Sequence, residues 1–220
     1  NSIYSVAALD AVTAVSSSPG DLVNIWDITD GSLLRSLKGH AGAVSFVCAM
    51  DSGQVASSSS ADSTLRIWNP HTGELLNTLH SSQKPGALAS FGGNLVFAAP
   101  VDPVAKDQPI QLWDVARGEK LVDLPDFPGG VGALCSIDGR FLLIGTYNGL
   151  VLHLDISRAA NRQNFSFKGH EKGVVSLAVI DRSRIASGSL DKTVRIWNRD
   201  SQETIQILNG HEGAVTGLAT

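Results

Sequence analysis

Two sets of residues in this sequence combine the side-chain types of a nucleophilic catalytic triad. They are His40, Ser58, Asp62 and Trp68 in the first set and His170, Ser187, Asp191 and Trp197 in the second. Serine, histidine and aspartate together can activate a hydroxyl for attack on a carbonyl. A single domain seldom needs two catalytic sites. A structural network, in contrast, can recur in a repeated fold, because a buried indole N–H and a buried imidazole both require hydrogen-bond partners. We therefore predict that both sets are structural and that no residue is catalytic.

No other combination of residues predicts a metal or cofactor site. Cys48 and Cys135 both lie in apolar stretches, which favours buried thiols that behave as small apolar side chains. His71, His80 and His153 share no metal-ligand spacing with one another or with the cysteines. His153 occupies a strand position equivalent to Ile196 of a later segment, which predicts a buried histidine. We expect no metal and no cofactor.

The composition describes a folded protein of modest acidity. The chain has 220 residues, a formal net charge of −4 and a hydrophobic fraction of 43%. That hydrophobic fraction is too high for a disordered chain. No apolar run reaches the length of a membrane span, and the acidity disfavours a nucleic-acid-binding surface, which needs clustered Lys and Arg. Two cysteines without a disulfide framework favour an intracellular location, cytoplasmic or nuclear.

Two sequence markers recur about every 43 residues along the chain. The first is an apolar segment that ends in Trp followed by Asp or Asn, with a degenerate copy at Leu154-Asp155; the four Trp copies are Trp26-Asp27, Trp68-Asn69, Trp113-Asp114 and Trp197-Asn198. The second marker is Gly-His, at 39–40, 169–170 and 210–211. In both four-residue sets the Asp lies six residues before its Trp and the Ser four residues before its Asp. The sequence is therefore built from repeats.

Each repeat is long enough for four short strands. In the last complete repeat, β-branched and apolar runs at 174–180, 184–189, 193–198 and 204–208 are separated by turn-forming residues. No stretch holds a helical apolar period over ten residues. Four strands in about 43 residues are typical of one blade of a β-propeller. The predicted fold class is all-β.

These markers together resemble the WD40-repeat family, and the resemblance covers essentially the whole chain. It implies a single propeller region of four-stranded antiparallel blades at about 1–39, 40–81, 82–126, 127–169 and 170–210. Residues 211–220 are then expected to form the first strand of a sixth blade. Because the family usually closes with seven blades, the chain is expected to be part of a longer protein.

The resemblance also implies how each four-residue set is connected: Trp N–H to Ser hydroxyl, hydroxyl to His, and His to Asp. Three repeats depart from this pattern. The fourth repeat has Leu154 in place of Trp and Asn148 in place of Asp, and the third repeat lacks Gly-His. In the first repeat, Asp21 lies one residue closer to its Trp than the Asp of the two complete sets does. We expect these three blades to be held by apolar packing alone.

Loops on one face of a propeller are the expected contact points for a partner. On this face we expect a proline-stiffened insertion with Val101, Val104 and Lys106, and turns of the last complete repeat. The candidate partner-binding residues are Val101, Val104, Lys106, Glu171, Lys172 and Leu190.

The resemblance implies a non-catalytic scaffold that mediates protein–protein interactions within a larger complex. The alternative is the substrate-recruiting propeller of a ubiquitin ligase or of a kinase-linked protein. The Trp-Asp-x-Arg signature of some ligase receptors is missing, because Arg117 follows Trp113-Asp114 one residue too late. The expected partners are other proteins, with no nucleic acid and no membrane span.

Overall fold

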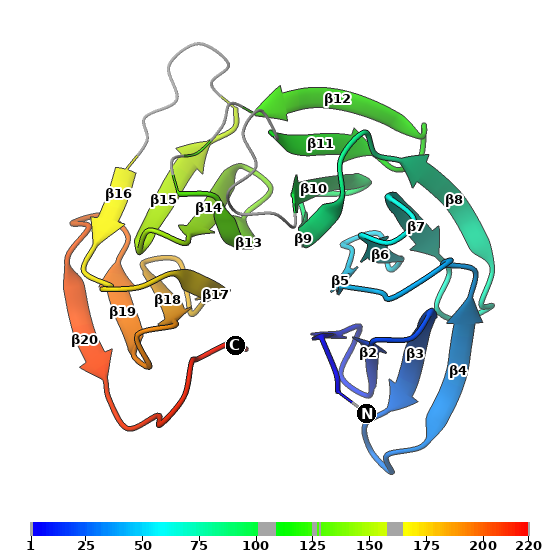
Figure 1. Ribbon diagram of the computed structural model, residues 1–220, viewed down its shortest axis with the longest axis horizontal. Coiled ribbons are helices and arrows are strands. Elements are labelled where there is room, and N and C mark those ends of the chain that lie inside the picture. The colour runs from blue at the N-terminus through cyan, green and yellow to red at the C-terminus, as the bar shows by residue number, and fades with distance from the viewer. Residues whose placement is uncertain (1, 101–108, 125–126, 128, 158–164, 220) are drawn as a thin grey trace. The chain divides into compact units, whose positions relative to one another are not determined.

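The described part of the chain forms five antiparallel sheets, each made of four strands that are consecutive in sequence. A computed structural model describes residues 2–100, 109–124, 127, 129–157 and 165–219. We number the sheets as blades one to five in chain order. Within each blade the strands lie side by side in sequence order, as Figure 1 shows. This is the topology of a propeller blade, and it confirms the predicted all-β fold class.

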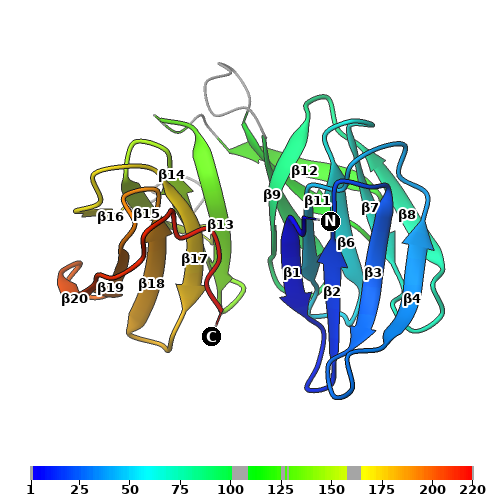
Figure 2. The ribbon, with the colours of Figure 1, turned by 60° about the horizontal axis from the view of Figure 1, so that its bottom comes forward.

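Blades one to three make up the first of two compact units. Blade one contains β1 (Ser5–Ala8), β2 (Thr13–Ser17), β3 (Leu22–Asp27) and β4 (Leu33–Lys38). Blade two contains β5 (Phe46–Ala49), β6 (Val55–Ser59), β7 (Thr64–Trp68) and β8 (Leu75–His80). Blade three contains β9 (Pro85–Ser90), β10 (Leu95–Pro100), β11 (Ile110–Asp114) and β12 (Glu119–Leu124). Figure 2 shows the four strands of blade one side by side.

Blades four and five make up the second unit. Blade four contains β13 (Val131–Ile137), β14 (Phe141–Thr146), β15 (Leu150–Asp155) and β16 (Phe165–Lys168). Blade five contains β17 (Val174–Val179), β18 (Arg184–Ser189), β19 (Val194–Asn198) and β20 (Thr204–Leu208). The four strands predicted for this last repeat are confirmed to within one residue at each end.

In the described residues, three apolar clusters lie between neighbouring blades, and a fourth lies between blade five and the segment after β20. Trp68 of blade two packs with Val15, Val23 and Ile25 of blade one. In the second unit, Trp197 of blade five packs in the same way with residues of blade four, among them Leu143, Val151 and Phe167. Trp68 and Trp197 therefore each fill the space between their own blade and the preceding one, where they exclude water from a large apolar area.

A break in strand register immediately precedes every third-strand Trp. The pairing with the fourth strand shifts between the residue before the Trp and the Trp itself in blades one, two, three and five. Such a bulge bends the strand and turns the following side chain. In blade four, where Leu154 replaces Trp, the described pairing of β15 with β16 contains no such shift.

The segment after β20 differs from the sequence-based expectation. Residues 211–219 form no strand, yet Val215 is buried against blade five, where its N–H donates to the carbonyl of Ser189 at 3.0 Å. A β-strand needs a neighbouring strand with which its backbone can form hydrogen bonds. The described residues contain no second strand of a sixth blade that could pair with this segment. The assignment of this segment to a sixth blade, and of the chain to one propeller region, stays a prediction.

The described residues contain no helix with the length and apolar character needed to cross a membrane.

Candidate functional site

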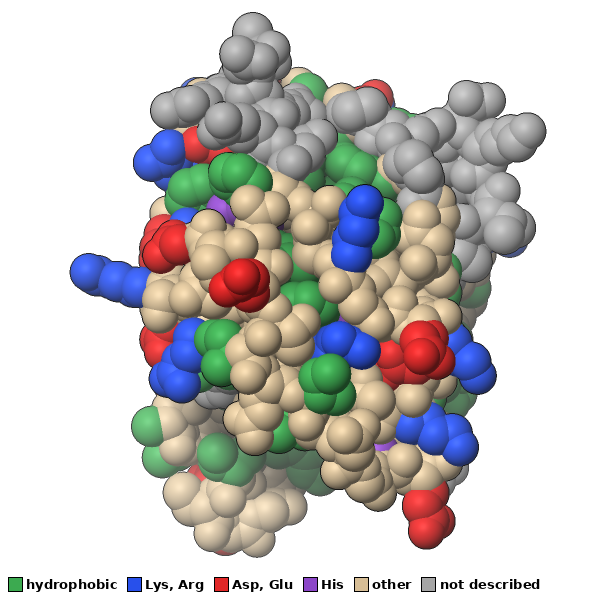
Figure 3. All heavy atoms as spheres, turned by 90° about the vertical axis from the view of Figure 1, so that its left-hand side faces the viewer, with side chains coloured by type: hydrophobic (Ala, Val, Ile, Leu, Met, Phe, Trp, Pro, Cys, Tyr) green, Lys and Arg blue, Asp and Glu red, His purple; other side chains and the backbone are tan. Residues whose placement is uncertain are grey.

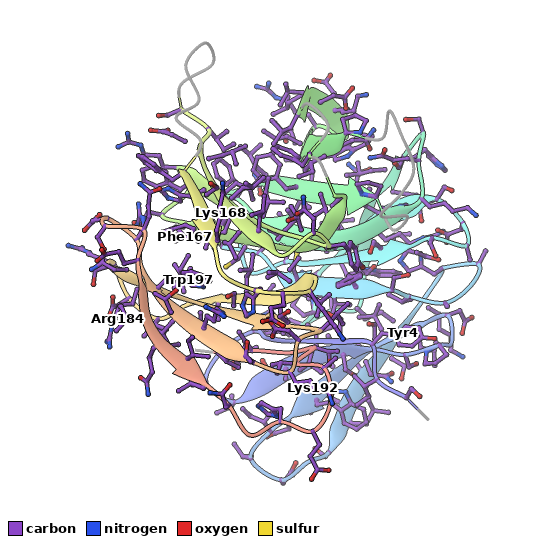
Figure 4. All side chains as sticks on the ribbon, turned by 60° about the vertical axis from the view of Figure 1, so that its left-hand side comes forward. Tyr4, Phe167, Lys168, Arg184, Lys192 and Trp197 are labelled. Atoms are coloured by element: carbon purple, nitrogen blue, oxygen red, sulfur yellow. The ribbon has the colours of Figure 1, made fainter. Side chains whose placement is uncertain are left out.

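Blade five contains a continuous hydrogen-bond chain that starts at its Trp. The indole N–H of Trp197 donates to the Ser187 hydroxyl at 2.7 Å. Because that hydroxyl has one proton, it donates to Nε2 of His170 at 2.8 Å, which leaves Nδ1–H to donate to the Asp191 carboxylate at 2.7 Å. Figure 4 shows Trp197 beside Phe167, whose ring centroid lies 5.6 Å away. The structure thus brings together all four residues of the second predicted set.

Blade two repeats this chain with one correction to the predicted set. The Trp68 indole donates to Ser57, not Ser58, at 2.8 Å, and Ser57 also contacts His40 Nε2 at 2.8 Å. His40 Nδ1 lies 2.9 Å from the Asp62 carboxylate, as expected. The prediction of Ser58 is wrong: its hydroxyl donates to the carbonyl of Gly86 at 2.9 Å.

The error at Ser58 has a physical cause in the turn between the second and third strands. Counting back from Asp62 assumed turns of equal length, but this turn is one residue longer in blade two than in blade five. Side chains alternate between the two faces of a strand, so a slip of one residue moves the serine to the wrong face. Counting from the Trp along the strand pairing avoids this: Ser57 lies two residues after Val55, the partner of Trp68, and Ser187 two residues after Ile185, the partner of Trp197.

A threonine joins each network, and sequence reasoning missed it. The Thr193 hydroxyl donates to Asp191 at 2.7 Å and lies 3.3 Å from His170 Nδ1. Thr64 makes the same two contacts, with Asp62 at 2.7 Å and with His40 at 3.3 Å. The signal was present in the sequence, since both sets have a Thr two residues after the Asp.

Burial sets the electrostatics of the two networks. Desolvation lowers the pKa of His40 and His170, although the neighbouring carboxylates oppose this shift. Desolvation raises the pKa of Asp62, but hydrogen bonds from the Ala41 N–H, Thr64 and His40 outweigh it and lower the pKa to about 2. The pKa of Asp191 is lowered by the same kinds of contact. Each network therefore holds a neutral imidazole on an ionised carboxylate.

The burial and hydrogen bonding of the two serine hydroxyls determine whether either could act as a nucleophile. Ser57 and Ser187 are both 0% exposed, and each hydroxyl already accepts from an indole and contacts an imidazole. A nucleophile must reach the reacting atom of a substrate within about 3.5 Å. Neither hydroxyl has an open side from which a substrate could approach, so the arrangement orders the blade and presents no nucleophile.

The Gly of each Gly-His marker makes room for an arginine and the Trp ring. A Cβ built on Gly39 would lie 2.7 Å from Nη1 of Arg66 and 3.2 Å from the ring of Trp68. At Gly169 the corresponding distances are 2.6 Å to Arg195 and 3.1 Å to the Trp197 ring. Any larger residue would push the linker away from the network that the following His anchors.

The remaining blades keep parts of the network. In blade one the Trp26 indole donates to Ser16 at 2.8 Å, so the expectation that blades one, three and four rely on apolar packing alone is wrong for blade one. In blade three the indole nitrogen of Trp113 is buried without a hydrogen-bond partner among the described residues. In blade four the Leu150 N–H donates to the Thr146 hydroxyl at 3.1 Å across the β14–β15 turn.

Three of the candidate partner-binding residues lie on the loops that the blade-five network holds in place. The backbone N–H of Glu171 donates to Asp191 at 3.1 Å, and the carbonyl of Lys172 accepts from the Ser189 hydroxyl at 3.1 Å. The N–H of Leu190 donates to the carbonyl of Gly173 at 2.9 Å. The backbones of Glu171, Lys172 and Leu190 are thus fixed while their side chains are exposed. Val101, Val104 and Lys106 lie outside the described residues.

Two further residues extend this surface and were missed from the sequence. Tyr147 is 38% exposed and precedes Asn148 in blade four, as Leu190 precedes Asp191 in blade five. Lys192 is exposed in the β18–β19 turn; Figure 4 shows it at the opposite end of β18 from Arg184. We call this surface the turn face; it consists of Tyr147, Glu171, Lys172, Leu190 and Lys192.

No group of three or more His, Cys, Asp and Glu side chains within the described ranges is arranged to hold a metal ion. Both cysteines are free, and burial raises the pKa of Cys48 to about 12 and of Cys135 to about 11. These thiols are therefore poor nucleophiles.

The chain is similar to a family of known repeats and to several characterised sequences. The family model "WD domain, G-beta repeat" matches residues 31–69 and 161–198, the two segments that contain the complete networks. The chain is 28% identical to zinc finger CCCH domain-containing protein 17 of Oryza sativa subsp. japonica, over 84% of this chain and 40% of that protein.

Two WD repeat-containing proteins show the same level of similarity. WD repeat-containing protein 82 of Drosophila melanogaster is 29% identical over 92% of this chain and 66% of its own length. WD repeat-containing protein 18 of Danio rerio is 26% identical over 94% of this chain and 54% of its own length. The chain thus spans less than two thirds of the length of each of these relatives.

Among solved structures, the computationally designed Ika8 protein superposes with a TM-score of 0.73 at 28% identity. The superposition covers 99% of this chain and 65% of the designed protein.

Proposed function

Because the chain belongs to the WD40-repeat family, we propose that it is a non-catalytic scaffold that binds other proteins within a larger complex. The observation that carries this proposal is that blade five separates its buried polar network from its exposed side chains. The polar groups that could do chemistry are buried and bonded to one another, whereas the turn face places exposed side chains on loops whose backbone the network holds. A fixed backbone lowers the conformational entropy lost when a partner binds.

The surface charge supports a protein partner over a nucleic acid. On the face drawn in Figure 3, Lys and Arg side chains are interspersed with Asp and Glu side chains. A nucleic-acid-binding surface instead concentrates cations along the path of the phosphates. With a net charge of −4 for the whole chain, recognition through phosphate neutralisation is disfavoured.

We further propose an intracellular location, in the cytoplasm or the nucleus. Its support is the pair of free, partly buried thiols Cys48 and Cys135, a state that a reducing compartment preserves. No observation favours the substrate-recruiting propeller of a ubiquitin ligase or of a kinase-linked protein, so neither is proposed.

The test is site-specific photo-crosslinking with the full chain expressed in cells. A photoreactive residue at position 190 is compared with one at position 184, an exposed site at the other end of β18. We expect position 190 to capture a small set of proteins that position 184 does not. Each captured protein, once purified, should bind the wild-type chain and bind Leu190→Asp less tightly. Equal capture at both positions, or capture that Leu190→Asp does not weaken, would contradict the proposal.

A further inference from the structure

We infer that the turn face takes an acidic peptide segment of a partner protein, one that carries an apolar side chain among its carboxylates. This inference rests on the proposed function and adds the chemistry of the partner. Four properties of the turn face carry it: its side chains are dispensable for the fold, one of them sits on strained backbone, its lysines are unpaired, and its apolar residues lie together.

Blade two shows that the fold does not need the side chains of the turn face. Its network has the same donors and acceptors as the blade-five network, at similar distances of 2.7–2.9 Å. At the positions of Lys172, Leu190 and Lys192, however, blade two has the small residues Gly42, Ala61 and Ser63. The same local structure therefore forms without two lysines and a leucine. Their presence in blade five serves something other than the fold.

Lys192 occupies a backbone conformation that its side chain disfavours. Its φ is +73°, in the left-handed region that glycine adopts freely, and Ser63 holds the equivalent place with φ +55°. A non-glycine residue in this region costs about 1 kcal/mol or more and recurs at sites that bind ligands. Glycine would adopt this backbone conformation at a lower free-energy cost. A lysine at this position therefore points to a role for its ammonium group.

The two lysines of the turn face have no ionic partner of their own. Neither Lys172 nor Lys192 forms an ion pair within the described residues, and both are exposed. The nearby Asp191 carboxylate is occupied by His170, Thr193 and the Glu171 N–H. The turn face thus carries two cations, Lys172 and Lys192, against the single exposed carboxylate of Glu171. This excess of positive charge favours an acidic segment over a basic one.

Leu190 and Tyr147 supply the apolar part of the surface. They are 36% and 38% exposed and occupy equivalent turns in neighbouring blades of one unit. Both border Gly173: the Leu190 N–H donates to its carbonyl, and a Cβ built there would lie 3.1 Å from the Tyr147 ring. An apolar pair on the same surface as two lysines fits a segment that alternates acidic and apolar residues.

The inference is tested with defined probes and the full 220-residue chain. The probes are a capped peptide of alternating Glu and Leu, matched peptides of alternating Lys and Leu and of alternating Glu and Ser, single-stranded oligothymidine, and vesicles of phosphatidylserine with phosphatidylcholine. Titration calorimetry should show binding of the Glu–Leu peptide that weakens with added salt. The other probes should bind more weakly or not at all. Tighter binding of the Lys–Leu peptide, the oligonucleotide or the vesicles would overturn the inference.

The variant Lys192→Gly separates binding from folding. It removes one cation and also relieves the backbone strain, so the protein should unfold at the same or a higher urea concentration while it binds the Glu–Leu peptide severalfold more weakly. The matched control is Ser63→Gly, which relieves the same strain in blade two and should leave peptide affinity unchanged. Equal effects of both variants on affinity would overturn the placement of the site.

Failure of this inference is distinguishable from failure of the proposed function. If position 190 captures a partner and the crosslinked segment of that partner is basic or uncharged, the scaffold proposal stands and the acidic-peptide inference is wrong. If position 190 captures no partner, the scaffold proposal itself fails. A crosslinked acidic segment with an apolar residue supports both.

Discussion

One hydroxyl group determines whether each third-strand indole has a hydrogen-bond partner. Trp26, Trp68 and Trp197 each donate to a serine on the second strand, and that serine always lies two residues after the one paired with the Trp. In blade three, Trp113 pairs with Val96, so the corresponding residue is Ala98. Its methyl group cannot accept a hydrogen bond, which explains the unpartnered indole nitrogen.

Substitution Ala98→Ser should therefore stabilise the protein. Ala98 is 1% exposed, and a hydroxyl there would accept from Trp113 as Ser16 accepts from Trp26. The expected gain in the free energy of unfolding is about 1 kcal/mol, measured by urea denaturation. The control is Ala99→Ser, which buries a hydroxyl at the neighbouring position, 0% exposed, and should destabilise by about 1–3 kcal/mol. A loss of stability in Ala98→Ser would show that the serine position has been assigned incorrectly.

His153 is a second residue whose surroundings determine a measurable property. As its strand position predicted, it is buried, and its ring stacks between those of Phe141 and Phe165 with centroids 4.7 and 5.9 Å away. Neither ring nitrogen of His153 has a hydrogen-bond partner in the part of the chain that the structure describes. Burial, together with the nearby Arg199 guanidinium, lowers the pKa of His153 to about 4, although the carboxylates of Asp155 and Asp200 oppose this shift.

This shift predicts acid destabilisation. Because the folded state holds His153 neutral, its stability is complete above the unfolded pKa of 6.5 and falls as the pH drops toward about 4, where the unfolded chain binds the extra proton. The loss should reach about 2–3 kcal/mol. In His153→Phe, the difference in the free energy of unfolding between neutral pH and pH near 4 should shrink by this amount. An identical pH dependence in variant and wild type would contradict the assignment.

At the scale of elements, neighbouring blades approach closely because small residues line their contact. Gly145 of β14 faces Val174 of β17, and a Cβ built on it would lie 2.8 Å from Cγ1 and 3.0 Å from the carbonyl oxygen of Val174. Gly188 of β18 faces Val215 in the same manner, at 2.7 and 3.0 Å. Val215, in the segment after β20, is thus placed against blade five as Val174 of β17 is placed against blade four.

Substitution Gly145→Ala should force β14 and β17 apart. Overpacking of this kind costs about 1–3 kcal/mol, because neither the valine nor its carbonyl can move without breaking strand pairing. Urea denaturation should show a corresponding decrease in the free energy of unfolding. In contrast, Gly217→Ala should have little effect, because a Cβ there meets no atom within 4 Å. Equal stability of Gly145→Ala and wild type would mean that the two strands can separate at no cost.

The strands of this protein were predictable because turn residues bound them on both sides, and the bounds in blade five hold to within one residue. Sequence spacing also located seven of the ten network residues, and it missed Thr64 and Thr193. It failed at Ser58, because the length of a turn does not show which face a side chain takes. It could not place Tyr147 on the turn face either, because an exposed aromatic in a turn has no pattern of its own.

At the scale of the whole molecule, the fourth strands differ in how well their apolar side chains are covered. One equivalent position on the fourth strand is apolar in every blade. In blades one to four its side chain is at most 2% exposed, and the residues are Leu37, Leu79, Leu124 and Phe167. Leu208 occupies this position in blade five and is 41% exposed, with Ile205 and Ile207 of the same strand also exposed. In the described residues, β20 carries no charged side chain, so nothing on the strand opposes association.

The 220-residue chain should therefore self-associate through the apolar side of blade five as its concentration rises. Substitution Leu208→Glu should shift the chain toward monomer in size-exclusion chromatography with light scattering, because association would then bury a carboxylate. The matched control is Leu76→Glu in β8, where the wild-type leucine is also 41% exposed but the blade's own apolar position, Leu79, is covered. Leu76→Glu should leave self-association unchanged. If both variants reduce it equally, general hydrophobicity of the outer strands drives association; if neither does, the exposed side of blade five is not an association surface.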